Sequence, residues 1–250
     1  MLFETHAHYD DAAFDADRDA VLKEVHKTVE FAINPGCDIP TSQFARSLSQ
    51  KYDWIYFAAG IHPENVEGCT VKDLDAVREL AADPKCVAVG EIGLDYYWDT
   101  TYRELQKELF LRQCEMAVEL DKPVIIHDRE AHGDSLDTAK SVKGLRGVFH
   151  CYSGSAEMAE ELIKMGFYLG FDGPVTYKNN KKAAEVLKVC PPDRILIETD
   201  SPYMSPVPVR GKRNDSGNLK YIAEKIAEIL EIPADEIVKI TNENARKCFF

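Results

Sequence analysis

The N-terminal segment Met1-Leu2-Phe3-Glu4-Thr5-His6-Ala7-His8 joins a short apolar run to two histidines that are two residues apart. In an extended strand, residues two apart project from the same face, so His6 and His8 could meet one metal ion. An isolated His-x-His pair is more often a polar strand end in solvent. The segment therefore gains meaning only if later strands end in matching ligands, and they do.

Seven further runs resemble the first one. They are short, apolar and rich in β-branched and aromatic residues, as strands buried on both faces should be. The expected strands cover residues 2–8, 29–34, 55–61, 86–92, 123–127, 147–150, 167–171 and 195–200. Helical apolar spacing lies between or after them, over residues 74–81, 101–121, 158–165 and 219–230, and another helix is expected from Pro233.

This alternation of strands and helices in 250 residues predicts an α/β fold, a single-domain (β/α)8 TIM-type barrel over residues 1–250. An open doubly wound sheet is the alternative, but no Gly-rich G-x-G-x-x-G loop follows the first strand. No linker-like region divides the chain. The irregular segment 201–217 is expected to be a long loop after the last barrel strand.

Composition and charge exclude several classes of protein. The hydrophobic content of 45% is ordinary for a globular enzyme, no signal peptide is expected, and no apolar run approaches the roughly 20 residues that span a bilayer. Seven cysteines without a C-x-x-C pair predict reduced thiols and a cytoplasmic location. A net charge of −13 argues against a sequence-independent DNA coat, but bound cations can reverse the charge locally at a catalytic site.

Metal-ligand side chains fall at the ends of five expected strands. They are His6, His8, Glu91, His127, His150 and Asp200. Singly, each has an ordinary explanation as a core histidine or an acidic helix cap. In a barrel, however, the carboxyl ends of the strands meet at one mouth, so together these residues predict a metal site.

Four imidazoles and two carboxylates exceed the needs of one tetrahedral zinc ion and suit two divalent cations that share a carboxylate. Asp200 could also orient the attacking water or take its proton, so Glu91 and Asp200 are the expected catalytic residues. Mg²⁺, Mn²⁺ and Zn²⁺ all accept such ligands. We expect Glu91 to bridge two ligand sets, with His6, His8 and Asp200 at one ion and His127 and His150 at the other.

Several segments resemble the TatD-type metal-dependent deoxyribonucleases, which belong to the wider barrel of metal-dependent hydrolases. The motifs are spread over essentially the whole chain: 5–8, 60–63, 90–97, 123–127, 149–154, 198–202, 210–214 and 241–245. The resemblance implies a barrel with two divalent cations that hydrolyses nucleic-acid phosphodiesters, often as a 3′-to-5′ exonuclease. It supports the ligand roles above and implies DNA, single-stranded or damaged, as substrate, without a membrane or an obligate protein partner.

Two positions depart from the family pattern. Family members usually have Asp before the Thr-His-x-His motif, where this chain has Glu4. Glu4 shares a face with His6 and His8 but lies deeper, so it is expected to support the ligands rather than bind metal. Asp128 follows His127 where Ser is common, which should alter local hydrogen bonding more than the ligand set.

Substrate contacts are expected from basic residues near the mouth, where arginine suits bidentate phosphate binding. The candidates are Arg129, Arg210, Lys212 and Arg213, although the last three could also form a solvated basic loop. Tyr96, Tyr97 and Trp98 could stack bases or only pack their loop. His62, followed by Pro63, is expected to shape a turn and could reach the substrate, but it is not expected to bind metal.

Two other functions remain open at this level. A barrel hydrolase could instead cleave ester or amide bonds, as in a lactone, a cyclic amide or an aminoacyl ester. Many such barrels bridge two metals with a carboxylated lysine, but residues 86–92 contain no lysine and Glu91 occupies that role. A scaffold with a vestigial site should have lost ligands, whereas all six remain here.

Overall fold

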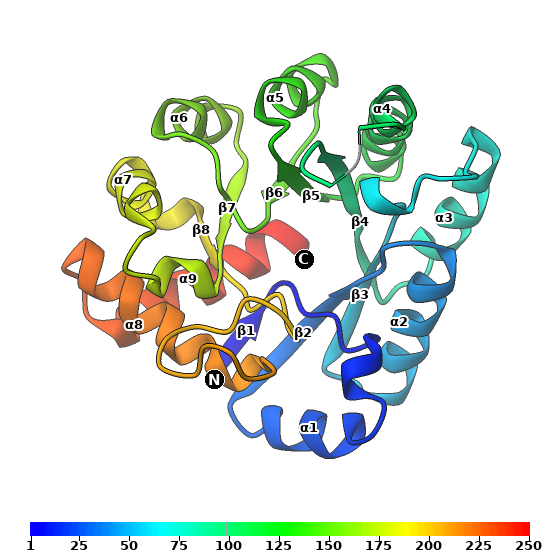
Figure 1. Ribbon diagram of the computed structural model, residues 1–250. Coiled ribbons are helices and arrows are strands. Elements are labelled where there is room, and N and C mark those ends of the chain that lie inside the picture. Colours follow the sequence, from blue (N-terminus) through cyan, green and yellow to red (C-terminus); the bar gives the residue numbers. More distant parts are fainter. Residues whose placement is uncertain (99) are drawn as a thin grey trace.

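The strands lie side by side in the order in which they occur in the sequence, forming one parallel sheet that curves into a barrel (Figure 1). The computed structural model describes residues 1–98 and 100–250. The strands are β1 (Leu2–Glu4), β2 (Val29–Pro35), β3 (Ile55–Ala59), β4 (Cys86–Asp95), β5 (Val124–Arg129), β6 (Gly147–Phe149), β7 (Tyr168–Phe171) and β8 (Ile195–Ile197).

Helices surround this sheet and connect each strand to the next (Figure 1). The α-helices are α1 (Arg18–Val25), α2 (Ile39–Lys51), α3 (Leu74–Ala81), α4 (Arg103–Glu119), α5 (His132–Ser141), α6 (Ala156–Lys164), α7 (Lys181–Val189), α8 (Leu219–Leu230) and α9 (Ala234–Phe249). Short 3-10 helices are η1 (Ala12–Phe14), η2 (Pro63–Asn65), η3 (Val71–Asp73), η4 (Gly173–Thr176), η5 (Pro192–Arg194) and η6 (Ser216–Asn218). The predicted (β/α)8 architecture is confirmed.

The barrel is nearly closed where β1 meets β8, a junction that we call the seam. A single parallel bridge joins Ala7 and Ser201 just beyond the two strands. Backbone N–H groups complete it: His8 donates to the Ser201 carbonyl at 2.7 Å, and Asp200 donates to the His6 carbonyl at 2.9 Å. The seam therefore fixes the backbone of three expected metal ligands.

Apolar side chains fill the barrel interior at the end opposite the mouth. Phe3, Phe31 and Leu196 are buried there with residues from the other strands, and Phe249 of α9 joins the same cluster. In Figure 1 the red helix α9 lies behind the strands, and it contacts β1, β6 and β8. A second, larger apolar layer lies between the strands and the surrounding helices. The hydrophobic core therefore does not depend on the polar residues at the mouth.

The strand limits differ from the sequence-based prediction at the mouth. β4 and β5 were expected to end at Ile92 and His127, but they remain paired as far as Asp95 and Arg129. Gly93 permits this pairing, because a Cβ at that position would collide with the His127 carbonyl oxygen, and its φ of 146° suits glycine. Conversely, β1 and β8 are shorter than expected, because only one bridge continues the sheet past Glu4 and Ile197.

Across residues 1–98 and 100–250, none of the helices combines the length and the apolar character needed to cross a bilayer.

Candidate metal centre

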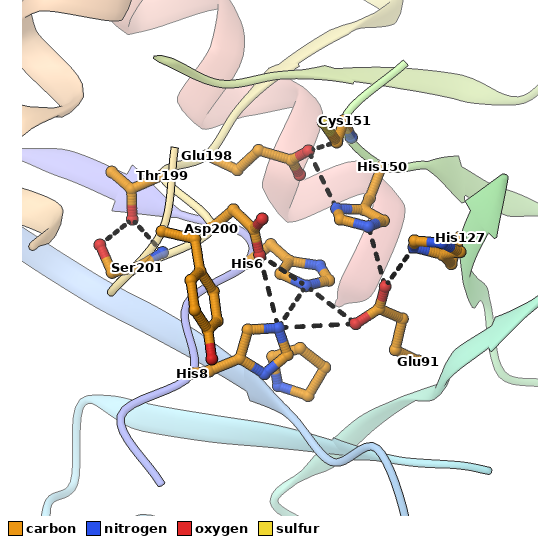
Figure 2. A network of polar contacts seen from close by, with 12 residues as sticks. His6, His8, Glu91, His127, His150, Cys151, Glu198, Thr199, Asp200 and Ser201 are labelled. Atoms are coloured by element: carbon orange, nitrogen blue, oxygen red, sulfur yellow. Dashed lines mark hydrogen bonds and ion pairs between the residues drawn. The ribbon is translucent and has the colours of Figure 1, made fainter. Parts of the chain in front are cut away.

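The Glu91 carboxylate lies at the middle of the expected ligands (Figure 2). Its Oε1 atom is 2.8 Å from His150 Nε2 and 3.1 Å from His127 Nδ1. Its Oε2 atom is 3.2 Å from His6 Nε2 and 3.5 Å from His8 Nε2. Oε1 also lies 3.4 Å from His62 Nε2, so the two carboxylate oxygens face different sets of histidine nitrogens, as expected of a bridging residue.

Asp200 completes the group around His6 and His8. Its Oδ1 atom is 3.5 Å from His8 Nε2 and 3.8 Å from His6 Nε2. The Asp200 backbone adopts φ 54°, in the left-handed region that aspartate tolerates better than most residues. This conformation directly follows the seam, and it aims the carboxylate back at the two histidines rather than along the strand.

The spacing of these atoms fits metal ligands better than hydrogen bonds. Ligands at about 2.1 Å from one ion lie roughly 3.0 to 3.4 Å apart, close to the separations around both Glu91 oxygens. Within the described part of the chain, the buried His150 Nε2 makes no hydrogen bond despite its 2.8 Å approach to Glu91. A cation between the two would satisfy both atoms. Five of the six expected ligand residues fall into two candidate groups for a cation, His6–Glu91–His150 and His6–His8–Asp200, whereas His127 groups with His62 and Glu64.

Two further carboxylates lie behind His127 and His150, on the side away from Glu91. Asp95 Oδ2 is 2.9 Å from His127 Nε2, and Glu198 Oε1 is 3.5 Å from His150 Nδ1. The hydrogen bond to Asp95 fixes the His127 tautomer and turns the other ring nitrogen toward a metal. Glu198 Oε1 instead accepts a hydrogen bond from the Cys151 N–H at 2.6 Å, and among the described residues His150 Nδ1 has no hydrogen-bond partner. The sequence analysis missed both residues. The available signal was spacing, because Asp95 follows Glu91 by four residues and Glu198 precedes Asp200 by two.

The electrostatics reflect this concentration of buried charge. Burial raises the pKa of Glu91, but His150 and His6 outweigh it and hold that pKa well below its usual range. Burial lowers the pKa of His127, but hydrogen bonds to Asp95 and Glu91 raise it to about 9. Without metal, a proton on His127 thus offsets the charge of the neighbouring carboxylates, and a cation could take its place.

Glu4 lies behind the ligands, as expected, and its side chain links the two strands at the seam. Its Oε1 atom accepts hydrogen bonds from the backbone N–H groups of His6 and Thr199, both at 3.0 Å, and its Oε2 atom accepts one from the Thr199 hydroxyl at 2.6 Å. Burial raises the pKa of Glu4 to about 8, although these donors favour the charged form. Glu4 thus connects the backbones of β1 and β8 where ladder bonds are missing.

His62 was expected to shape a turn rather than bind metal, and it shapes the turn while its side chain also reaches the cluster. Its Nδ1 atom accepts a hydrogen bond from the Glu64 N–H at 3.2 Å, while its Nε2 atom is 3.4 Å from Glu91 Oε1. Its ring meets the His127 ring edge-on at 4.4 Å. The side chain is buried, so His62 is a neighbour of the candidate metal ligands that sequence reasoning undervalued.

The four basic residues expected to bind substrate fall into different environments. Arg129 stacks on Tyr97, and Arg210 lies over the Tyr177 ring at 4.2 Å. Lys212 is exposed in the loop after β8. Arg213 instead pairs with Asp17 at 2.7 and 2.8 Å and donates to the Ala13 carbonyl. The guanidinium donors of Arg213 are thus already engaged, unlike those of Arg129 and Arg210 among the described residues.

Fold and site together define a metal-dependent hydrolase built on a (β/α)8 barrel. Comparison with known proteins supports this class and narrows it. Residues 3–250 match the family described as TatD related DNase, and the chain belongs to that family.

Named relatives agree with the family assignment. The chain is 46% identical to the metal-dependent hydrolase YabD of Bacillus subtilis, covering 100% of this chain and 99% of that protein. It is 35% identical to the metal-dependent hydrolase YcfH of Escherichia coli K12, covering 100% and 96%. The crystal structure of YjjV, a TatD homologue from E. coli K12, superposes with a TM-score of 0.93 at 30% identity and covers 99% of this chain and 97% of that one.

Proposed function

We propose that this protein is a divalent-metal-dependent deoxyribonuclease that hydrolyses DNA phosphodiester bonds, as a 3′-to-5′ exonuclease on single-stranded or damaged DNA. One observation carries the proposal: the two oxygens of Glu91 face separate sets of histidine nitrogens. This arrangement suits two cations that share one carboxylate, as in many phosphate-hydrolysing enzymes. The family description as TatD related DNase supports DNA as the substrate.

In this proposal, two ligand groups meet at Glu91. The cations, which could be Mg²⁺, Mn²⁺ or Zn²⁺, would polarise the scissile phosphate and make water a stronger nucleophile. The protein's own residues fix the positions, because a hydrogen bond to Asp95 orients His127 in the second group and the seam orients the first group. The groups are His6, His8 and Asp200 on one side, and His127 and His150 on the other.

Asp200 is the proposed base. Its side chain is 16% exposed, against 4% for Glu91, so it lies nearer the solvent from which water arrives. An ionised carboxylate can accept hydrogen bonds only, and in this position it can orient a water molecule and take its proton. Burial raises the pKa of Asp200, but His8 and His6 lower it below its usual value, which keeps the carboxylate charged.

Arg129 and Arg210 are the proposed phosphate contacts, with Lys212 in support. Neither guanidinium has a hydrogen bond or ion pair with a described residue, and both are placed by an aromatic ring. For Arg213 to contact the substrate, the bonds to Asp17 would have to be exchanged. We also propose a single domain over residues 1–250 and a cytoplasmic location, the latter supported by seven free cysteines.

The proposal is tested with labelled oligonucleotides that differ in end, strandedness and damage, over a series of divalent metals. We expect single-stranded DNA to be shortened from its 3′ end in a metal-dependent reaction that chelation abolishes. Small esters and cyclic amides, assayed in parallel, should react far more slowly. Robust cleavage by metal-stripped protein, or a clear preference for an ester or amide, would overturn the proposal.

A further inference from the structure

Two exposed aromatic residues follow the strand that carries Glu91. Tyr97 is 54% exposed and Trp98 is 64% exposed, although large apolar side chains of this chain are mostly buried. The two rings meet edge-on, with centroids 4.8 Å apart and an angle of 86°. They lie immediately beyond the end of β4, at the mouth of the barrel. Neither ring is needed to complete the core.

Their neighbour Tyr96 shows what a packed aromatic residue looks like in the same loop. The Tyr96 ring is partly buried, and its hydroxyl donates to Asp134 at 2.7 Å. Arg103 covers its face at 4.1 Å while also donating to Asp134 at 2.9 Å. Tyr96 therefore packs the loop, whereas Tyr97 and Trp98 point their rings outward.

Arg129 is stacked on this exposed pair. Its guanidinium carbon is 3.8 Å from the centre of the Tyr97 ring and 5.1 Å from that of Trp98. Among the described residues it has no hydrogen-bond or ion-pair partner, in contrast to Arg103. Stacking fixes the plane of a guanidinium and leaves its N–H donors at the edge available for a planar or tetrahedral oxyanion.

One carboxylate ties this group to the candidate metal centre. Asp95 Oδ1 accepts hydrogen bonds from the backbone N–H groups of Tyr97 at 2.9 Å and Trp98 at 3.3 Å. Its other oxygen, Oδ2, is 2.9 Å from His127 Nε2. Arg129 lies two residues beyond His127 and is the strand partner of Asp95. The aromatic pair and the arginine are thus held in register with the metal ligands.

We propose that Tyr97, Trp98 and Arg129 form a subsite for a single-stranded nucleotide next to the scissile phosphate. Arg129 binds the neighbouring phosphate, and the exposed ring of Trp98 stacks on a base. This inference rests on the proposed nuclease function and specifies its substrate. Bases inside a duplex have both faces covered by their neighbours, so a stacking subsite selects single strands and frayed ends.

Fluorescence tests the base contact directly, because Trp54 and Trp98 are the two tryptophans of the chain. Trp54 stacks on His26 at 4.5 Å, in the α1 and β3 region, and a Trp54→Phe variant leaves Trp98 as the sole reporter. The metal-loaded variant is titrated with hydrolysis-resistant phosphorothioate oligothymidylate and with an abasic phosphorothioate of equal length and charge. We expect the first ligand to quench the fluorescence of Trp98. The second ligand should bind at least about tenfold more weakly. Equal quenching or equal affinity would overturn the base contact.

Kinetics on single-stranded DNA test the same subsite by a second route. Trp98→Ala should raise KM about tenfold with little change in kcat, Trp98→Phe should restore most of the loss, and Arg129→Ala should raise KM similarly. The matched control is Phe44→Ala, because Phe44 is a 39% exposed ring of α2 with Arg18 at 4.8 Å. Unchanged metal content in Trp98→Ala shows that Asp95 and His127 are undisturbed.

The two proposals can fail separately. If the protein cleaves no nucleic acid but oligothymidylate still quenches Trp98, the nuclease function fails and the base-binding subsite stands. If cleavage is robust while Trp98→Ala, Phe44→Ala and the parent protein share one KM, the subsite fails and the nuclease function stands.

Discussion

The two ends of the barrel have opposite compositions. At the mouth, buried carboxylates and imidazoles crowd around Glu91, and several polar atoms such as His150 Nε2 have no hydrogen-bond partner. At the other end, the Phe3 and Phe31 rings pack at 4.0 Å with a tilt of 38° in the apolar cluster that includes Phe249 of α9. Asn244 of α9 donates to the carbonyls of Pro192 and Ile195, both at 2.8 Å, so the polar groups there are satisfied.

This difference indicates that the mouth serves mainly activity and the α9 end mainly stability. Buried like charges and unsatisfied polar atoms cost folding free energy, and proteins keep them where chemistry requires them. The α9 end has the properties of an ordinary core, with apolar burial and paired amides. Substitutions at the mouth should therefore change activity more than stability, and substitutions at the α9 end should do the reverse.

The largest expected effect is on activity at the mouth, from Glu91→Gln. The amide keeps the shape of the side chain but loses the charge that faces both histidine sets, and the bound metals stabilise several kcal/mol of developing charge. We expect a loss of about a thousandfold or more in kcat on DNA and reduced metal content. The unfolding midpoint, measured without metal, should shift less than in Phe31→Ala. A variant with normal metal content and near-normal kcat would contradict the bridging role.

The converse substitution is Phe31→Ala at the α9 end. Phe31 is 8% exposed on β2, which carries none of the candidate ligands, and it contacts Phe3 in the apolar cluster. Truncating a buried phenylalanine leaves a cavity, so the free energy of unfolding should fall by about 3 kcal/mol. Denaturant unfolding gives this value, and kcat of the folded protein should be unchanged. A large loss of kcat below the unfolding transition would show that the two ends are coupled.

The barrel could be predicted from the sequence because its strands are apolar runs separated by turn residues. Glu91 and His127 could be predicted because they lie in recognisable motifs on β4 and β5. β4 was expected to end at Ile92, however, and it continues past Gly93 to Asp95. Only the packing of β5 shows that Gly93 lets the His127 carbonyl approach. Asp95 therefore lay outside the expected strand and was not predicted to contact His127. Residues that act through another side chain are defined by distance, which the sequence does not contain.

An intermediate effect is expected from Asp95→Asn, which probes the link between the aromatic pair and His127. Aspartate accepts at both oxygens, from the Tyr97 and Trp98 amides on one side and His127 on the other. Asparagine has one acceptor, so its NH₂ group must face a donor on one side. We expect metal affinity to fall about 10- to 100-fold, by titration with a chromophoric chelator. Unchanged affinity would mean that His127 is oriented without Asp95.

The smallest effect should come from Arg213→Ala. Arg213 lies at the mouth, but its contacts are those of a structural residue. Its guanidinium pairs with Asp17 and donates to the Ala13 carbonyl, holding the loop after β8 against the segment before α1. Exposed ion pairs contribute little, so the melting temperature should change little and KM for DNA should stay within about twofold. Arg210→Ala, in the same loop but stacked on Tyr177 with no ion pair to a described residue, should raise KM about tenfold by losing a phosphate contact. If Arg213→Ala raised KM as much as Arg210→Ala, the bonds to Asp17 would have to open for substrate, and the mouth would then be more mobile than its hydrogen bonds indicate.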